Sequence, residues 1–172
     1  MKEKYLLTIK ADDSPGLMGR VMAMLTRRRL VVESITMAKT DINTVVLISL
    51  EIMIATDDVK LLQLQLEKII EVFTTDARLC DALLIQKLAF YKLANAILQI
   101  PQGAAIHKYG AQIINCYPDS FVISKSGNEQ VINELYGKLE GKYLLGFTQT
   151  GSIAETMLLE NNDEWRIIGL AA

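Results

Sequence analysis

Hydrophobic positions in the first half of the chain follow two different periods. Some runs alternate or are rich in β-branched residues, as in strands, whereas two others place apolar residues three and four apart, as in amphipathic helices. The expected strands are residues 4–11, 30–39, 44–55 and 72–79, and the expected helices are residues 15–29 and 58–71. The predicted order is therefore strand, helix, strand, strand, helix, strand.

The second half of the chain repeats this order less clearly. The expected strands are residues 82–92, 112–117, 121–125 and 144–151; a helix is expected at 128–139, and another within 94–109, interrupted by Pro101 and Gly103. This order is the split βαβ, or ferredoxin-like, arrangement. We therefore predict an α+β protein with two ferredoxin-like domains, residues 1–80 and 81–172. The segment from Glu160 onward either docks on the body of the protein or contacts a partner.

The turn after the first expected strand carries a candidate binding site. Ser14 is a good N-cap, and Pro15 suits the first helical position because its missing N–H would be unpaired there. Gly16 leaves the first turn open, and free N–H groups at a helix start suit an anion such as a carboxylate. Asp13 could hold an ammonium group, so the turn could grip both charged ends of a free amino acid. The alternative is that the turn is only a turn and a cap.

Composition narrows the classes of function. The chain has 18 Lys and Arg against 20 Asp and Glu, a net charge of -2, which gives no electrostatic case for nucleic acid. Cys80 and Cys116 lack metal-type spacing, and we expect reduced thiols. The sequence shows no signal-type apolar core and no apolar run long enough to cross a bilayer. We therefore expect a cytoplasmic protein without a membrane partner.

No residue set in the sequence predicts catalysis or metal binding. The chain lacks a Gly-rich phosphate loop, a serine elbow and a cysteine–histidine motif. His107 is the single histidine and has no Cys, Asp or second His spaced around it as a metal ligand. The arginines at 27–29 either contact an acidic partner or phosphates, or form a solvated helix end whose charges complement the dipole.

Several motifs, taken in order, resemble the small regulatory subunit of acetolactate synthase, also called acetohydroxyacid synthase. The resemblance covers roughly residues 3–158. It includes the first turn, Asp13-x-Pro15-Gly16-Leu17 followed by Gly-Arg-Val, and the run Glu-Ser-Ile-Thr at 33–36. It continues in the second expected helix with Gln-Leu-Glu-Lys-Ile-Ile-Glu-Val at 65–72, and in the second half with Gln-Lys-Leu-Ala-Phe-Tyr-Lys at 86–92.

This resemblance implies a regulatory, non-catalytic protein. It implies an N-terminal ACT domain, a homodimer, a catalytic large subunit as partner, and feedback inhibition by valine or a related branched-chain amino acid. Thiamine diphosphate, magnesium and FAD are expected only in the catalytic partner. The implied effector site uses Asp13, Ser14, Pro15, Gly16 and Leu17 of one subunit, and it is completed by Val31 and Val32 of the other.

Two positions depart from the family pattern. Val31 stands where the family usually has an effector-binding Asn, and Ser49 or a neighbour stands where an Arg usually enters the third strand. An amide lost from such a site costs about 1 kcal/mol or somewhat more, which weakens binding severalfold or more but need not abolish it. Two other readings therefore stay open: a stand-alone or degenerate ACT-type sensor with a different partner, and an enzyme on a ferredoxin-like scaffold.

Overall fold

The computed structural model describes residues 1–154, and these form two compact units. The first unit is Met1–Leu84 together with the segment that begins at Gly151, and the second is Ile85–Thr150. We expected the division after residue 80 and assigned everything beyond it to the second domain. The segment after Glu160, for which we left two alternatives, lies outside the described residues.

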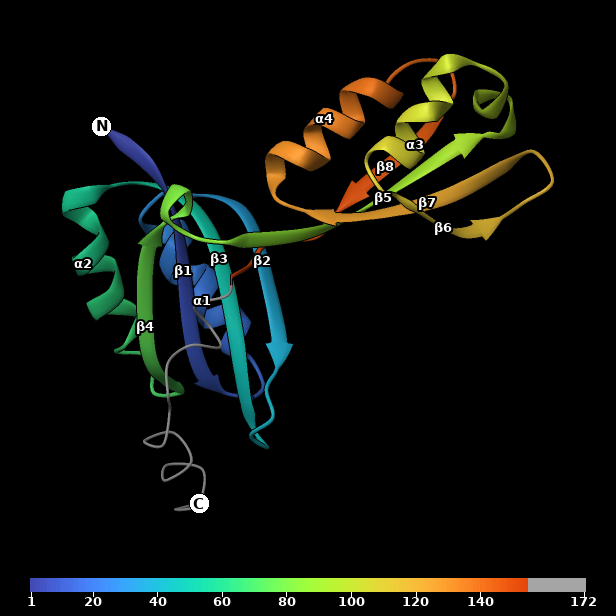
Figure 1. The fold of residues 1–172 in the computed structure, drawn as a ribbon. Helices are drawn as coiled ribbons and strands as arrows, with labels where there is room; N and C mark the ends of the chain where they lie inside the picture. Colours follow the sequence, from blue (N-terminus) through green and yellow to red (C-terminus); the bar gives the residue numbers. More distant parts are fainter. Residues whose placement is uncertain (155–172) are drawn as a thin grey trace. The chain divides into compact units, whose positions relative to one another are not determined.

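The first unit is an antiparallel four-stranded sheet with two helices (Figure 1). Its elements are β1 (Lys2–Asp12), α1 (Leu17–Arg27), β2 (Val31–Lys39), β3 (Val45–Ala55), α2 (Thr56–Leu66) and β4 (Val72–Leu79). The strand order is β2-β3-β1-β4, so β2 and β4 are the edges. The predicted strand–helix–strand–strand–helix–strand order is confirmed for this unit.

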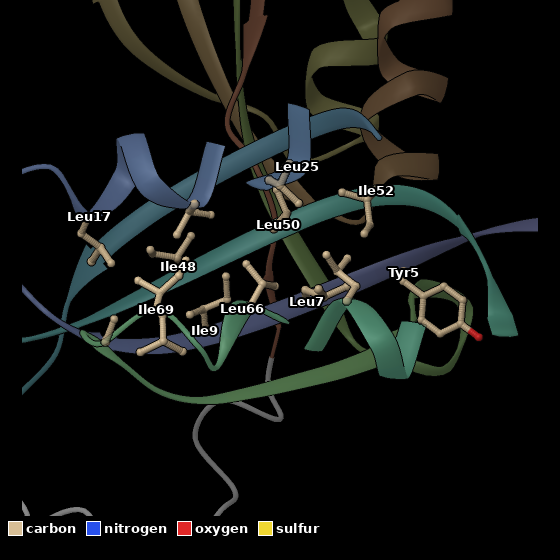
Figure 2. Packing of buried hydrophobic residues seen from close by; sticks show 14 of the residues in the cluster. Tyr5, Leu7, Ile9, Leu17, Leu25, Ile48, Leu50, Ile52, Leu66 and Ile69 are labelled. Carbon is tan, nitrogen blue, oxygen red and sulfur yellow. The ribbon is translucent and has the colours of Figure 1, made fainter. Parts of the chain in front are cut away.

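The core of the first unit lies between the sheet and its two helices. Alternate residues of β1 and β3 point into it, including Ile9 and Leu50, and both have no exposed surface. Helix α1 contributes Leu17, Val21 and Leu25, which are spaced four apart and therefore share one helix face. Figure 2 shows Leu17 and Leu25 meeting side chains of β3 and of the α2 region in this single cluster.

The second unit repeats the same plan around its own core. Its elements are β5 (Ile85–Ala94), the 3₁₀ turns η2 (Asn95–Gln99) and η3 (Pro101–Gly103), α3 (Ala104–Lys108), β6 (Gln112–Cys116), β7 (Ser120–Gly127), α4 (Glu129–Leu139) and β8 (Leu144–Gln149). The strand order β6-β7-β5-β8 matches that of the first sheet. The α+β architecture with two ferredoxin-like domains is therefore confirmed.

The described end of the chain returns to the first unit. After β8, a two-residue strand β9 (Ile153–Ala154) follows Gly151 and Ser152. The Ser152 hydroxyl, 1% exposed, donates to the carboxylate of Glu51, which is itself 2% exposed. Ser34 donates to the same carboxylate at 2.6 Å. These hydrogen bonds satisfy a buried charged group, and they explain why residues 151–154 group with the first unit.

Both helices of the first unit are shorter than expected. Helix α1 begins at Leu17 with Gly16 as its N-cap, and Gly16 has a φ of +84°, which favours glycine. The prediction that Ser14 caps a helix beginning at Pro15 is therefore wrong. Helix α2 ends at Leu66, and residues 67–71 form turns closed by Ile69 N–H to Leu66 O and Val72 N–H to Ile69 O.

Candidate functional site

The turn between β1 and α1 is held by backbone hydrogen bonds at its entrance. The N–H of Asp13 donates to Thr44 O at 2.6 Å, and the N–H of Ser14 donates to Asp12 O at 2.9 Å. The first bond joins the turn to the connection between β2 and β3, and the second lies within the turn itself. The carboxylate of Asp13 and the backbone of Gly16 remain exposed. The turn therefore presents one anionic side chain beside an open helix start.

The side chain of Arg20 makes hydrogen bonds with two residues of this turn. Its guanidinium donates to the Ser14 hydroxyl at 3.0 Å and to Pro15 O at 3.3 Å. The same group binds the carboxylate of Glu71 in a bidentate pair at 2.6 and 3.2 Å. A Cβ atom at Gly16 would lie 3.1 Å from Arg20 Nη1. The side chain of Ser14 thus accepts from Arg20 instead of capping the helix.

Some of the expected anion-binding N–H groups are present, but not all. The N–H of Leu17 donates to Ser14 O at 3.2 Å, and its side chain is buried in the core. We had expected the N–H of Leu17 to bind a carboxylate, but it is already used in this hydrogen bond. Within residues 1–154, the N–H groups of Gly16, Met18 and Gly19 donate to no other protein group. These three groups and the nearby Arg20 make the helix start attractive to an anion.

The other half of the expected site lies on the edge strand β2. Val31 is 64% exposed, whereas Val32 packs partly against the core. Val31 pairs with Met53 of β3, while Asp12, next to the turn, pairs with Val45. These two partners are eight residues apart on β3, or about 26 Å at the rise of a strand. The two halves of the expected site therefore lie at opposite ends of the same sheet.

The second unit offers a buried tyrosine, which has a structural role. The hydroxyl of Tyr91 donates to Ile132 O at 2.9 Å, and burial raises the pKa of Tyr91 to about 12. A phenol that stays protonated near neutral pH suits a structural hydrogen bond. His107 lies in the last turn of α3 and is exposed.

The described residues offer neither a metal cluster nor a membrane span. Residues 1–154 contain no cluster of three or more His, Cys, Asp or Glu that could hold a metal ion. Cys80 and Cys116 form no disulfide with each other. Over the same residues, no helix is both long and apolar enough to cross a membrane.

Comparison with known proteins defines the class of the first unit. Residues 13–74 match the ACT domain family, and this range covers the turn, both helices, β2, β3 and the first residues of β4. The fold agrees with this match, so the first unit is an ACT domain.

The similarity extends beyond the ACT domain to particular proteins. The chain is 26% identical over 153 residues to the acetolactate synthase small subunit of Mycobacterium leprae, covering 87% of this chain and 89% of that protein. It is 24% identical over 153 residues to the acetolactate synthase small subunit of Bacillus subtilis, covering 88% and 89% of the two chains. The resemblance stated from the sequence motifs is thereby confirmed.

A solved structure supports the fold over nearly the same length. The crystal structure of the acetolactate synthase small subunit from Thermotoga maritima matches with a TM-score of 0.81, covering 88% of this chain and 96% of that chain. The sequences of the two proteins are 16% identical, so this match concerns the fold. It includes both ferredoxin-like domains in the same order along the chain.

Proposed function

We propose that this chain is the regulatory subunit of an acetolactate synthase, which binds the catalytic large subunit and raises its activity. The observation that supports this proposal is sequence similarity across both domains to proteins named acetolactate synthase small subunit. An ACT domain alone would support much less, because one fold hosts many functions. Thiamine diphosphate, magnesium and FAD belong to the catalytic partner in this proposal, and the chain itself performs no catalytic step.

An activity titration tests the proposal directly. The purified chain alone should convert no pyruvate to acetolactate. Added in increasing amounts to the large subunit from the same genome, it should raise the rate of acetolactate formation to a plateau. A rate that stays unchanged over a wide titration, with both proteins folded, would contradict the assignment.

We place the effector site between two copies of the ACT domain. The Asp13–Leu17 turn and Val31 lie about 26 Å apart along one sheet, so one subunit cannot use both on the same small molecule. A two-fold axis beside the edge strand β2 would set the turn of each subunit against the Val31 end of the other. This geometry favours a homodimer with two equivalent sites.

The chemistry of the two halves suits a branched-chain amino acid. Its carboxylate would accept from the free N–H groups of Gly16, Met18 and Gly19. Its ammonium would face the exposed carboxylate of Asp13, a charge-assisted contact. Its side chain would meet apolar atoms of Val31 from the other subunit, and Val31 is 64% exposed in the single chain. Valine, or a related aliphatic amino acid, fits this combination better than a charged one.

Calorimetry with valine, leucine and isoleucine tests the site. Asp13→Asn should weaken binding about tenfold or more, because it removes a charged hydrogen-bond partner. Asp41→Asn is the matched control, since Asp41 is also an exposed loop carboxylate but lies outside the turn. Gly16→Asp would be a poorer probe, because φ at Gly16 is +84° and Arg20 fills the space above it. Equal affinities for Asp13→Asn and wild type would reject the site.

The replacement of the family asparagine by Val31 supports a second candidate function. In that alternative the chain is an ACT-type sensor, stand-alone or degenerate, whose partner is a different protein. Val31→Asn should tighten amino-acid binding several-fold if the missing amide is the cause of weak binding. Amino-acid binding together with no effect on the large subunit would favour the sensor. Absence of binding even for Val31→Asn would favour a degenerate paralogue.

A further inference from the structure

A groove of about 1100 Å³ runs between helix α1 and the turns that follow helix α2. We call it the α1–α2 groove. Its lining residues come from two segments of the ACT domain: Arg20, Ala23, Met24, Arg27, Arg28, Gln65, Lys68, Ile69, Ile70 and Glu71. The residues of the expected effector site are not among them. The groove adjoins the effector turn through Arg20, which also contacts Ser14 and Pro15, and its other lining residues lie outside that turn.

The groove carries a strong excess of positive charge. Its lining includes Arg20, Arg27, Arg28 and Lys68 but a single carboxylate, Glu71. That carboxylate is already held by Arg20 at 2.6 Å. Within residues 1–154, neither Arg27 nor Lys68 forms an ion pair. In a chain whose net charge is -2, this concentration of unpaired cations indicates an anionic occupant.

Part of this charge is held in place by neighbouring side chains. The Nε of Arg28 donates to Gln65 Oε1 at 2.6 Å, which joins the end of α1 to α2 across the groove. The bidentate pair of Arg20 with Glu71 joins the same two segments nearer the turn. An occupant would therefore meet guanidinium groups that are already positioned, which lowers the entropy cost of binding.

The groove is also apolar, which narrows the choice of occupant. Ile70 is 96% exposed beside Arg20 and Lys68 in the lining, and Met24 contributes from α1. Helix α2 carries two further exposed leucines, Leu61 and Leu64, which are 50% and 48% exposed, and Leu61 shares a helix face with Gln65, four residues further on. Arginine, methionine and large apolar side chains together are typical of protein–protein interfaces.

We infer that the α1–α2 groove docks an acidic segment of the catalytic subunit that also carries apolar side chains. This inference rests on the proposed function, which supplies the partner. A second copy of this chain is a poor occupant, because two copies of the groove would bring like charges together. A nucleic acid or a small anion would leave the exposed Ile70 without an apolar partner. An acidic, partly apolar protein segment uses both features.

Charge-reversal variants in the activation titration test the inference. Arg27→Glu and Lys68→Glu should each raise the concentration of chain needed for half-maximal activation about tenfold, and their binding should depend less on salt. The matched controls are Arg29→Glu and Lys60→Glu, exposed positions outside the groove with the same charge change. The controls should stay within about twofold of wild type. Ile70→Ser should weaken activation without altering the salt dependence.

Each outcome separates the groove from the proposed function. If wild type activates the large subunit but Arg27→Glu and Arg29→Glu weaken activation equally, the docking role of the groove is rejected. The proposed regulatory function then still stands. Failure of wild type to bind the large subunit, measured by interferometry, overturns both. Binding of a random-sequence DNA duplex by wild type that is lost in Arg27→Glu would replace the acidic protein segment with nucleic acid, and so overturn the inference. Circular dichroism of each variant confirms that it is folded.

Discussion

The buried side chain of Tyr91 in β5 contributes to the stability of the second domain. It has no exposed surface, packs against Phe147 with ring centroids 5.0 Å apart, and donates to Ile132 O of α4. The hydrogen bond joins strand and helix inside the core. Burial raises the pKa of Tyr91 from its ordinary value of 10.0 to about 12. Folding therefore favours the protonated phenol, and the protein should lose stability where the unfolded phenol ionises.

We predict opposite effects of Tyr91→Phe at moderate and at high pH. At pH 8 the variant should lose about 1 kcal/mol of unfolding free energy, because the carbonyl of Ile132 loses its donor. The stabilisation in wild type is complete below pH 10 and is lost as pH rises toward 12. The difference in unfolding free energy between the two proteins should therefore change by roughly 2 kcal/mol between pH 9 and 11.5 and so reverse its sign. Urea unfolding measures it.

The control for this prediction is Tyr117→Phe. Tyr117 is 48% exposed, so its side chain lies outside the buried core that surrounds Tyr91. A pH-dependent difference as large for Tyr117→Phe as for Tyr91→Phe would show that general alkaline unfolding, and not the buried phenol, is responsible.

The turn at the expected site shows how far sequence reasoning reaches at single residues. The open glycine and the exposed aspartate were identifiable, because Gly16 and Asp13 depend on local backbone chemistry. Arg20 was missed as an organiser of the turn, although its Gly-Arg-Val run was part of the family motif. Its partner Glu71 lies 51 residues away in the sequence. The hydrogen bond by which Arg20 takes the Ser14 hydroxyl away from the helix start therefore depends on the fold, which brings the two segments together.

Two glycines in the second domain have different surroundings: Gly103 is tightly packed, whereas Gly137 has free space around it. Gly103 ends η3 where a Cβ atom would lie 2.5 Å from Ile97 O, whereas Gly137 in α4 has nothing within 4 Å of such an atom. Gly103→Ala should therefore lose about 1–3 kcal/mol of unfolding free energy. Gly137→Ala should gain up to about 1 kcal/mol, because alanine is a better helix former. Thermal unfolding of both variants measures these two changes in stability. If both substitutions stabilise the protein, or both destabilise it, the described packing around the two glycines is contradicted.

Element order was predictable, whereas several element ends were not. The mostly apolar run over residues 44–55 predicted a central strand, and β3 spans Val45–Ala55 between β2 and β1. The spacing over 128–139 predicted a helix, and α4 follows its cap Asn128, which accepts from the Val131 N–H at 2.9 Å. Helix α2 stops early because Ile69 and Val72 turn back toward the core, so apolar spacing continues past the helix.

At the scale of the whole molecule, we predict a homodimer through the β2 edge of the ACT sheet. Light scattering at micromolar concentration should give twice the mass of one chain. Val31→Asp should shift the protein toward the monomer, because it buries a charge at the proposed interface. Leu79→Asp is the matched control on the opposite edge strand β4, where the leucine is 38% exposed. A wild-type mass of one chain, or equal effects of the two substitutions, would contradict this arrangement.

The two-domain plan was readable from the repeat of the element order, but the path of the chain end was not. The grouping of residues 151–154 with the first unit depends on Glu51, whose buried carboxylate is satisfied by Ser34 and Ser152. A carboxylate in the middle of an apolar strand signals a special environment, although its partner from 101 residues away cannot be read from spacing.

The distance between the turn and Val31 also ties ligand binding to assembly. In the proposed dimer each site takes one half from each subunit, so an amino acid binds only the assembled form. Ligand and subunit association are then thermodynamically linked, and each strengthens the other by the same factor. Dilution should weaken the apparent affinity for the amino acid, and saturating amino acid should hold the dimer together at lower protein concentration. The response of a cell to its branched-chain amino acids would then depend on how much of this subunit it makes.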